Sequence, residues 1–306
     1  MQARTLGAFI QEKLVSGRWI WRAGGRFEHT AHRYHWIGGT RPSVDETSWD
    51  KVMWSAGVRF NSLPSLAFFG NASNSFIPPS AKAVGGTLQE SDAFQPGRDG
   101  QLPNRDLRPE KGIGADLGLD FHPTESLSLT LRAFSNRVDD AIVDNVVSTT
   151  PSQVRSINAG RSLSRGFEVA VEQSLGESYR WFGNLTCTHA ELRNALDPDQ
   201  DGASTPFVPS YVANLGATLG LPFGITVSPY LQAIGRYFDS SSLGTRRAFG
   251  RYRRANLKGQ ASLSRNDRWA MSLILELNNL TNRKTEMPWQ FQDPGFNFQI
   301  SPQVVF

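Results

Sequence analysis

The sequence predicts an all-β fold, an antiparallel transmembrane β-barrel of about thirteen strands, and three observations support this. The last eleven residues, 296–306, alternate apolar and polar side chains and end on a phenylalanine. Segments with the same alternation recur backward along the whole chain, and the connections between them alternate between short and long. Because successive side chains of a strand face opposite sides, each segment has one apolar and one polar face. About 9 to 11 such residues cross a membrane.

Composition alone is a poor guide to this fold. The 306 residues are 39% hydrophobic, with a mean hydropathy of −0.37, yet a barrel with a wet interior has the same average. No run approaches 18 apolar residues, which excludes a spanning helix. The net charge is +4 and the cations are spread among the anions, so no nucleic-acid partner is expected. The single cysteine, Cys187, excludes an internal disulfide and falls on the lipid-facing side of its strand.

The alternation places each strand in turn. We expect strands at 6–14, 19–27, 54–61, 66–76, 113–121, 127–133, 167–171, 181–191, 211–221, 225–237, 254–263, 269–278 and 296–306. Short turns are predicted near 16–18, 62–64, 122–126, 174–178, 221–224 and 264–268. Long connections are predicted at 30–50, 77–110, 140–154, 192–209, 238–250 and 282–294. In an outer-membrane barrel the short turns are periplasmic and the long loops extracellular. Tryptophans just past three short turns, Trp19, Trp181 and Trp269, are typical of an interfacial aromatic girdle.

The polar face of these strands carries charges of both signs, which a wet lumen tolerates. They are Arg22, Arg26, Arg59, Arg132, Arg236, Arg254, Lys258, Asp116, Asp120, Glu168, Glu172 and Glu276. The mixture favours an ion-paired wall over a selective pore.

Several motifs, in their order and spacing, resemble those of TonB-dependent outer-membrane receptors. Phe76-Ile77-Pro78-Pro79 and the later 104–110 (NRDLRPE) are similar to an F-x-x-P and N-x-x-L-[KR]-P-E pair. The stretch 127–142 followed by 158–160 (NAG) and 164–168 (SRGFE) resembles the family's central strands. Further matches are 201–214, with Val208-Pro209 and Asn214, then 277–282 (LNNLTN) and 294–298 (PGFNF), where Phe296 stands at a position that is commonly Arg.

The resemblance implies that residues 1–306 are the C-terminal part of a 22-stranded barrel in the outer membrane of a Gram-negative bacterium. It also implies three partners. They are outer-membrane lipid, the TonB complex, which acts through a plug that is absent from this chain, and a small ligand such as a ferric siderophore. No cofactor is expected. An odd strand count, with the first strand descending from the loop side, agrees with missing upstream strands.

Two side-chain clusters are candidate sites in the long loops. His29, His32 and His35 form one cluster, and imidazole is a common ligand for transition metals and haem iron. Strand spacing sends His29 and His32 to opposite faces, so the alternative is an ordinary mixture of loop and interface groups. Asp197, Asp199 and Asp201 begin like a calcium loop, but its twelfth position would be Val208 instead of Glu. The alternative there is a solvated loop.

No nucleophile with a neighbouring base, zinc helix or carboxylate pair is visible, so the sequence does not predict an enzyme. Two other classes stay open at this point. A free-standing porin would conduct ions without a plug, and a soluble all-β binding module would need no detergent.

Overall fold

The computed structural model describes the chain except for residues 1, 34–45, 266–268, 289–290 and 306. Thirteen long antiparallel strands follow one another in sequence order and form a single sheet. They are β1 (Gln2–Ser16), β2 (Trp19–Arg33), β3 (Glu46–Leu63), β4 (Leu66–Ile77), β6 (Glu110–Thr124), β7 (Leu127–Thr149), β8 (Ser152–Leu175), β9 (Tyr179–Asn194), β10 (Tyr211–Leu221), β11 (Ile225–Ile234), β14 (Tyr252–Arg265), β15 (Ala270–Asn278) and β16 (Asn297–Val305). The predicted all-β class and the thirteen strands are confirmed.

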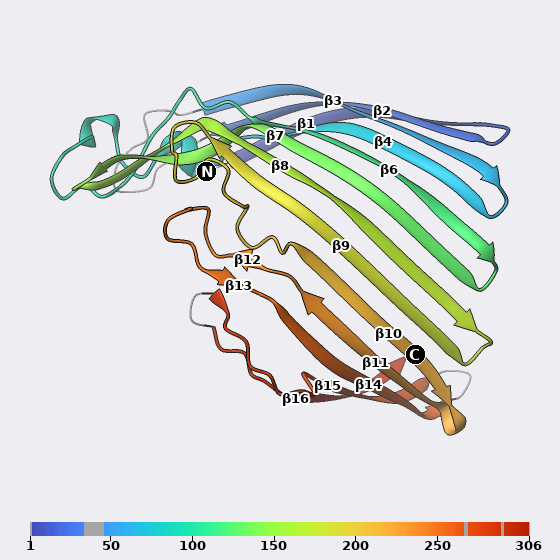
Figure 1. The fold of residues 1–306 in the computed structure, drawn as a ribbon. Helices are drawn as coiled ribbons and strands as arrows, with labels where there is room; N and C mark the ends of the chain where they lie inside the picture. Colours follow the sequence, from blue (N-terminus) through green and yellow to red (C-terminus); the bar gives the residue numbers. More distant parts are fainter. Residues whose placement is uncertain (1, 34–45, 266–268, 289–290, 306) are drawn as a thin grey trace.

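The sheet curves into an open trough (Figure 1). Strands β1 and β16 lie at the two ends of the strand order, so within the described residues the barrel is not closed. At one end of the trough, here called the turn end, neighbouring strands are joined by tight turns such as the one at Gly17, whose φ of 57° suits glycine. The opposite end carries the long connections and is called the loop end. The predicted alternation of short and long connections is therefore confirmed, except between β7 and β8.

The loop end also holds the short elements. These are α1 (Ala81–Gly85), the 3-10 turn η1 (Glu90–Asp92), β5 (Gly100–Leu102), β12 (Tyr237–Phe238) and β13 (Ala248–Phe249), whereas η2 (Pro222–Gly224) lies at the turn end. Strand β5 pairs in parallel with β8 and is the fourteenth strand of the main sheet. No helix among the described residues is long and apolar enough to span a lipid bilayer.

One sequence expectation about this end is wrong. Residues 140–154 were expected to form a long polar connection, but β7 continues to Thr149 and β8 begins at Ser152, so only two residues separate them. The reason is tertiary: β5 adds a ladder to β8, and the loop 78–109 packs against the extended hairpin. Polar side chains of this hairpin, which are typical of a loop, instead contact the neighbouring loop 78–109.

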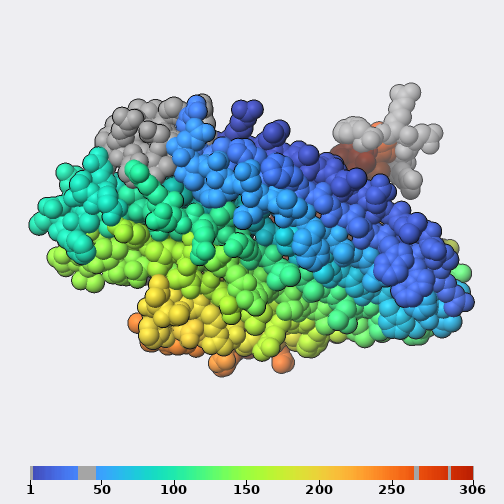
Figure 2. Space-filling model, turned by 90° about the horizontal axis from the view of Figure 1, so that it is seen from above, coloured from blue at the N-terminus to red at the C-terminus, as the bar shows by residue number. Residues whose placement is uncertain are grey.

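The register divides the sheet into two faces. Residues directly opposite one another across the strands share a face. One such row runs Val58, Gly70, Leu117, Ala133, Phe167 and Cys187 and is apolar. The adjacent row runs Arg59, Phe69, Gly118, Arg132, Glu168 and Thr186 and is mostly polar. The apolar row lies on the convex outer face, which forms a continuous surface over the first strands (Figure 2). The polar row lies inside the trough.

Candidate functional site: a charged inner wall and folded loops

The inner face of the trough is an ion-paired wall. Arg132 on β7 reaches Asp116 on β6 at 3.1 Å and Glu168 on β8 at 3.2 Å, so one guanidinium joins three strands. Farther along the sheet, Lys258 on β14 lies 3.2 Å from Glu276 on β15. Several of the residues predicted to face the lumen thus pair with one another, and the predicted mixed-charge wall is confirmed for these strands.

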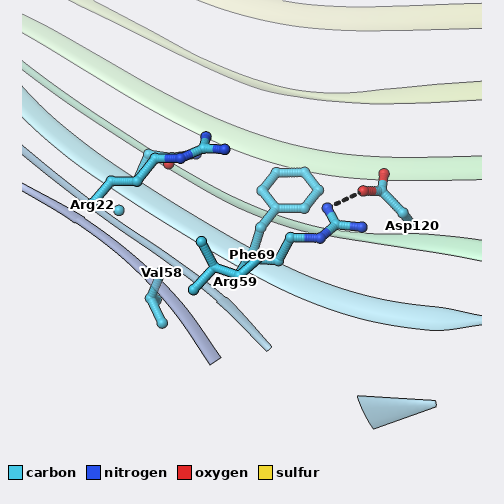
Figure 3. A pocket seen from close by; sticks show the side chains of 8 residues that line it. Arg22, Val58, Arg59, Phe69 and Asp120 are labelled. Atoms are coloured by element: carbon cyan, nitrogen blue, oxygen red, sulfur yellow. Dashed lines mark hydrogen bonds and ion pairs between the residues drawn. The ribbon is translucent and has the colours of Figure 1, made fainter. Parts of the chain in front are cut away.

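A hollow of about 310 Å³ opens in this wall toward the turn end. Arg22 and Arg59 extend over the wall on either side of the Phe69 ring, while Val58 points the other way (Figure 3). Arg59 pairs with Asp120, whose second oxygen accepts a hydrogen bond from Thr130 at 3.0 Å. Among the described residues no carboxylate lies within ion-pair distance of Arg22. The hollow therefore offers one uncompensated cation on a polar surface, in keeping with a wall that faces water or another polar body.

At the loop end, residues 78–109 fold into a platform against the tips of β7 and β8. Its apolar centre consists of Ala83, Val84 and Leu107, against which Trp49 and Ile142 pack. A buried hydrophobic cluster of this kind is expected in a folded unit and is unusual in a mobile loop. The platform is thus a small ordered unit at the mouth of the trough.

A buried amide, Gln153, fastens the outer part of the platform. Its Nε2 donates to the carbonyl oxygens of Asp92 at 2.8 Å and Arg98 at 2.7 Å, and its Oε1 accepts the Phe94 N–H at 2.8 Å. Phe94 has a φ of 61°, an uncommon value for an aromatic residue, and its side chain is exposed. Gln153 therefore satisfies three backbone groups of a strained loop from one buried position.

The motif residues of the sequence meet in the inner part of the platform. Asn158 accepts the Arg108 N–H at 2.8 Å and donates to the carbonyl oxygens of Arg108 and Asp140. Asn104 donates to the Ser156 carbonyl at 2.8 Å, and Glu110 accepts the Ile142 N–H at 2.7 Å. The 104–110 and 158–160 motifs are therefore two sides of one joint, which has a structural role.

A second joint lies between β15 and β16. Asp293 is buried and accepts hydrogen bonds from Thr285, the Gly295 N–H and Arg254. Burial by itself would raise the pKa of Asp293, but these donors outweigh it and lower the pKa to about 2. Asn279, also buried, accepts from Thr281 and donates to the Arg283 carbonyl. Sequence reasoning did not single out Asp293 or Gln153, because an acid or amide in a polar loop carries no local signal of burial.

The predicted histidine cluster is divided by the sheet. His29 lies on the outer face, with its Nδ1 2.7 Å from Asp50 Oδ1. His32 lies on the inner face, edge-on to Trp49 with a ring-centre distance of 5.3 Å. His35 lies outside the described residues. The structure thus brings His29 and His32 onto opposite faces, as their spacing predicts, and a capture role for the three stays a prediction.

The three aspartates of the predicted calcium loop have different partners. Asp197 accepts the Asp199 N–H at 3.0 Å, Asp199 accepts the Gly244 N–H at 2.8 Å, and Asp201 accepts the Asn194 N–H at 3.2 Å. Hydrogen bonds from Ser242 and Gly244 lower the pKa of Asp199. Within the part of the chain that is described, no group of three or more potential ligands converges on one point. The loop geometry is that of turns and a link to residues 242–244, and calcium binding stays a prediction.

Fold, face pattern and loops together define part of the wall of a β-barrel, and comparison with known proteins specifies the family. Residues 1–280 match the family described as TonB dependent receptor-like, beta-barrel. The chain therefore belongs to the TonB-dependent receptor β-barrel family, and the predicted resemblance is confirmed.

Individual relatives support the assignment. The chain is 23% identical over 281 residues to the "Ferrichrome outer membrane transporter/phage receptor" of Escherichia coli K12, covering 91% of this chain and 34% of that protein. It is 20% identical over 285 residues to the "Ferrioxamine receptor" of Yersinia enterocolitica, with 91% and 36% covered. The crystal structure of the ferric yersiniabactin uptake receptor FyuA from Yersinia pestis aligns with a TM-score of 0.67 at 17% identity, over 99% of this chain and 44% of that one. The chain spans about a third of the length of these curated relatives. Their printed names are those of transporters and receptors.

Proposed function

We propose that this chain forms part of the wall and the outer mouth of an outer-membrane receptor that takes up a scarce ligand, such as a ferric siderophore, with energy from TonB. The observation that carries the proposal is the family match over residues 1–280 together with the charged inner wall. Receptors of this shape enclose a plugged lumen. A polar wall with paired charges and an uncompensated Arg22 suits contact with such a plug.

In this proposal the apolar outer face contacts lipid of a Gram-negative outer membrane, and the loop end faces outward. The platform and the loops 195–210, 235–251 and 279–296 surround the mouth and make the first contact with the ligand. His32, on the inner face, is placed to contribute to capture, whereas His29 points to the outside of the trough. A plug and further strands are needed for transport, because the unpaired edges of β1 and β16 would each leave backbone groups unsatisfied in lipid.

Growth under iron limitation tests the proposal. We would express the chain alone, and the chain together with the coding sequence that flanks it, in a bacterium lacking its own ferric-chelate receptors. Growth on a supplied ferric chelate that requires TonB supports the proposal. Growth that persists without TonB contradicts energised transport.

A porin is the second candidate, and the observation that favours it is the open, polar inner face. Steady conductance in a planar bilayer, unaffected by any ferric chelate, would indicate the porin. Calcium binding by Asp197, Asp199 and Asp201 is tested separately by calorimetric titration, in which an absence of saturable heat contradicts it.

A further inference from the structure

One connection at the loop end differs from the others in charge. Residues 235–254, here called the basic loop, contain six arginines and one acidic residue, Asp239, which gives a net charge of +5. The platform, 78–109, has four cations and four anions, and residues 279–296 have two of each. The positive charge of the mouth is therefore concentrated between β11 and the start of β14.

Aromatic rings hold several of these guanidinium groups. Arg246 lies 4.1 Å and Arg236 lies 5.3 Å from the centre of the Phe238 ring. Arg254 lies 4.5 Å from the centre of the Tyr252 ring. A guanidinium stacked on a ring is held in orientation while the N–H groups at its edge stay available for hydrogen bonds. The stacking thus preorganises cations in the basic loop.

Part of this charge has no protein counterion. Arg247 pairs with Glu286 and Arg254 with Asp293. By contrast, Arg236 and Arg251 are exposed and have no carboxylate within ion-pair distance among the described residues, whereas Arg253, opposite Ala233, lies on the outer face and does not belong to this group. Arg246 is near Asp199, whose pKa its charge helps to lower, but its Nη1 is buried and finds no hydrogen-bond partner in the described part of the chain. The unpaired buried donor is costly and the neighbouring cations repel one another, and a bound anion would reduce both effects.

The backbone carries a second, independent feature. Arg251 has a φ of 57°, in the left-handed region that disfavours a residue with a long side chain. Gly250 beside it has a φ of 84°, and a Cβ there would lie 2.0 Å from the Gly235 carbonyl oxygen. Two consecutive left-handed residues hold the base of the basic loop in a sharp turn. An arginine in such a position is a strained feature of the kind that clusters at ligand sites.

We infer that the basic loop is the anion-recognising part of the mouth, and that the ligand is a net-negative metal chelate with planar or aromatic oxygen donors instead of an uncharged chelate. Arg236 and Arg246 supply oriented donors, and the neighbouring Tyr237 and Phe207 rings, whose centres are 6.5 Å apart, offer apolar contact to a flat ligand. The inference rests on the proposed function.

Two defined probes test it on the receptor purified in detergent together with its flanking sequence. One probe is the trianionic iron(III) complex of a tris-catechol ligand, and the other is the uncharged iron(III) complex of a tris-hydroxamate ligand. Binding is followed by quenching of tryptophan fluorescence. We expect saturable binding of the trianionic probe, weakening as salt is raised, and much weaker binding of the uncharged one.

The test variant is the double substitution Arg236→Gln with Arg246→Gln. Because it removes two charge-assisted contacts, the trianionic probe should bind about tenfold to a hundredfold more weakly. The matched control, Arg18→Gln with Arg180→Gln, removes the same charge from exposed positions at the turn end, away from the mouth, and should change binding less than about threefold.

The possible failures are distinguishable. Equal binding of both probes, with no effect of the test variant, overturns the inference and leaves the proposed function intact. An equal loss in the test and control variants shows only general attraction of charge and also overturns it. If neither probe binds and neither supports growth, the inference fails together with the proposed function.

Discussion

Single glycines on the inner face lie opposite large aromatic rings. Phe69 faces Gly118, Phe134 faces Gly166, and Phe182 faces Gly216. A Cβ on these glycines would lie 2.5, 2.8 and 2.7 Å from the respective ring. Each ring therefore covers the backbone of the next strand, which lets the sheet curve inward without a gap. The repetition depends on the register between strands and is visible only in the structure.

Substituting Gly166 should destabilise the barrel. In Gly166→Ala the new Cβ would lie 2.0 Å from the Cys187 carbonyl oxygen, and backbone cannot move aside as a flexible side chain can. We expect a loss of about 1–3 kcal/mol, seen as a lower melting temperature in detergent. Gly70→Ala is the control, because the nearest atom to its Cβ is 3.7 Å away. Equal melting temperatures for the two variants would contradict the close approach at Gly166.

The buried carboxylate of Asp293 should make stability depend on pH. Its pKa is lowered from 3.8 to about 2, so the stabilisation is complete above pH 4 and is lost as the pH falls through about 2. Asp293→Asn should cost about 1.5–3 kcal/mol at neutral pH, and this difference should disappear near pH 2. Hydrogen exchange of residues 283–296 at several pH values measures it. Asp106→Asn, at an exposed position, is the control, and a cost at Asp293 that does not vary with pH would refute the assignment.

The platform is the element that sequence reasoning described least well. Its motifs were recognisable, but residues 77–110 and 140–154 were both expected to be long polar connections. The structure instead pairs β5 with β8 and buries Ala83, Val84 and Leu107 against Trp49 and Ile142. Periodicity reports the surroundings of one segment at a time. A hairpin whose partner is another loop therefore has no regular alternation to detect.

Gln153 is the residue on which the outer platform depends. Gln153→Ala would remove the acceptor of the Phe94 N–H and a donor to the carbonyl oxygens of Asp92 and Arg98, although Asp92 keeps the Gln95 N–H, and the expected local cost is about 1–3 kcal/mol. We expect faster hydrogen exchange in residues 92–100 and unchanged exchange in the strands. Gln95→Ala, an exposed change in the same loop, should have no such effect. Unchanged exchange in Gln153→Ala would show that the platform is held elsewhere.

At the scale of the whole molecule, we expect the two faces of the trough to differ in how well they tolerate a charged substitution. Leu117 lies on the outer face and is 67% exposed in the absence of lipid. Asn184 lies on the inner face beside Asn214. If the outer face contacts lipid, Leu117→Arg should cost about 2–4 kcal/mol of folding free energy near the bilayer centre, whereas Asn184→Arg should be nearly neutral.

Folding into lipid vesicles, followed by the shift in gel mobility on heating, compares these two variants with the parent. The receptor is used with its flanking sequence so that the edges of β1 and β16 are not left unpaired. Equal folding of both variants would show that the outer face does not meet hydrocarbon, and would contradict the membrane placement proposed above.

The sequence by itself determined the all-β class, the thirteen strands, which face of each strand is polar, and the family, because alternation with a period of two is a property of each strand alone. Only the tertiary structure decided that Arg132 links Asp116 with Glu168, that His29 and His32 have separate surroundings, and that Gln153 and Asp293 are buried. It also decided that Arg236 and Arg246 stack on one ring. These relations depend on register between strands and on contacts between loops distant in the chain. Local sequence patterns do not encode such contacts.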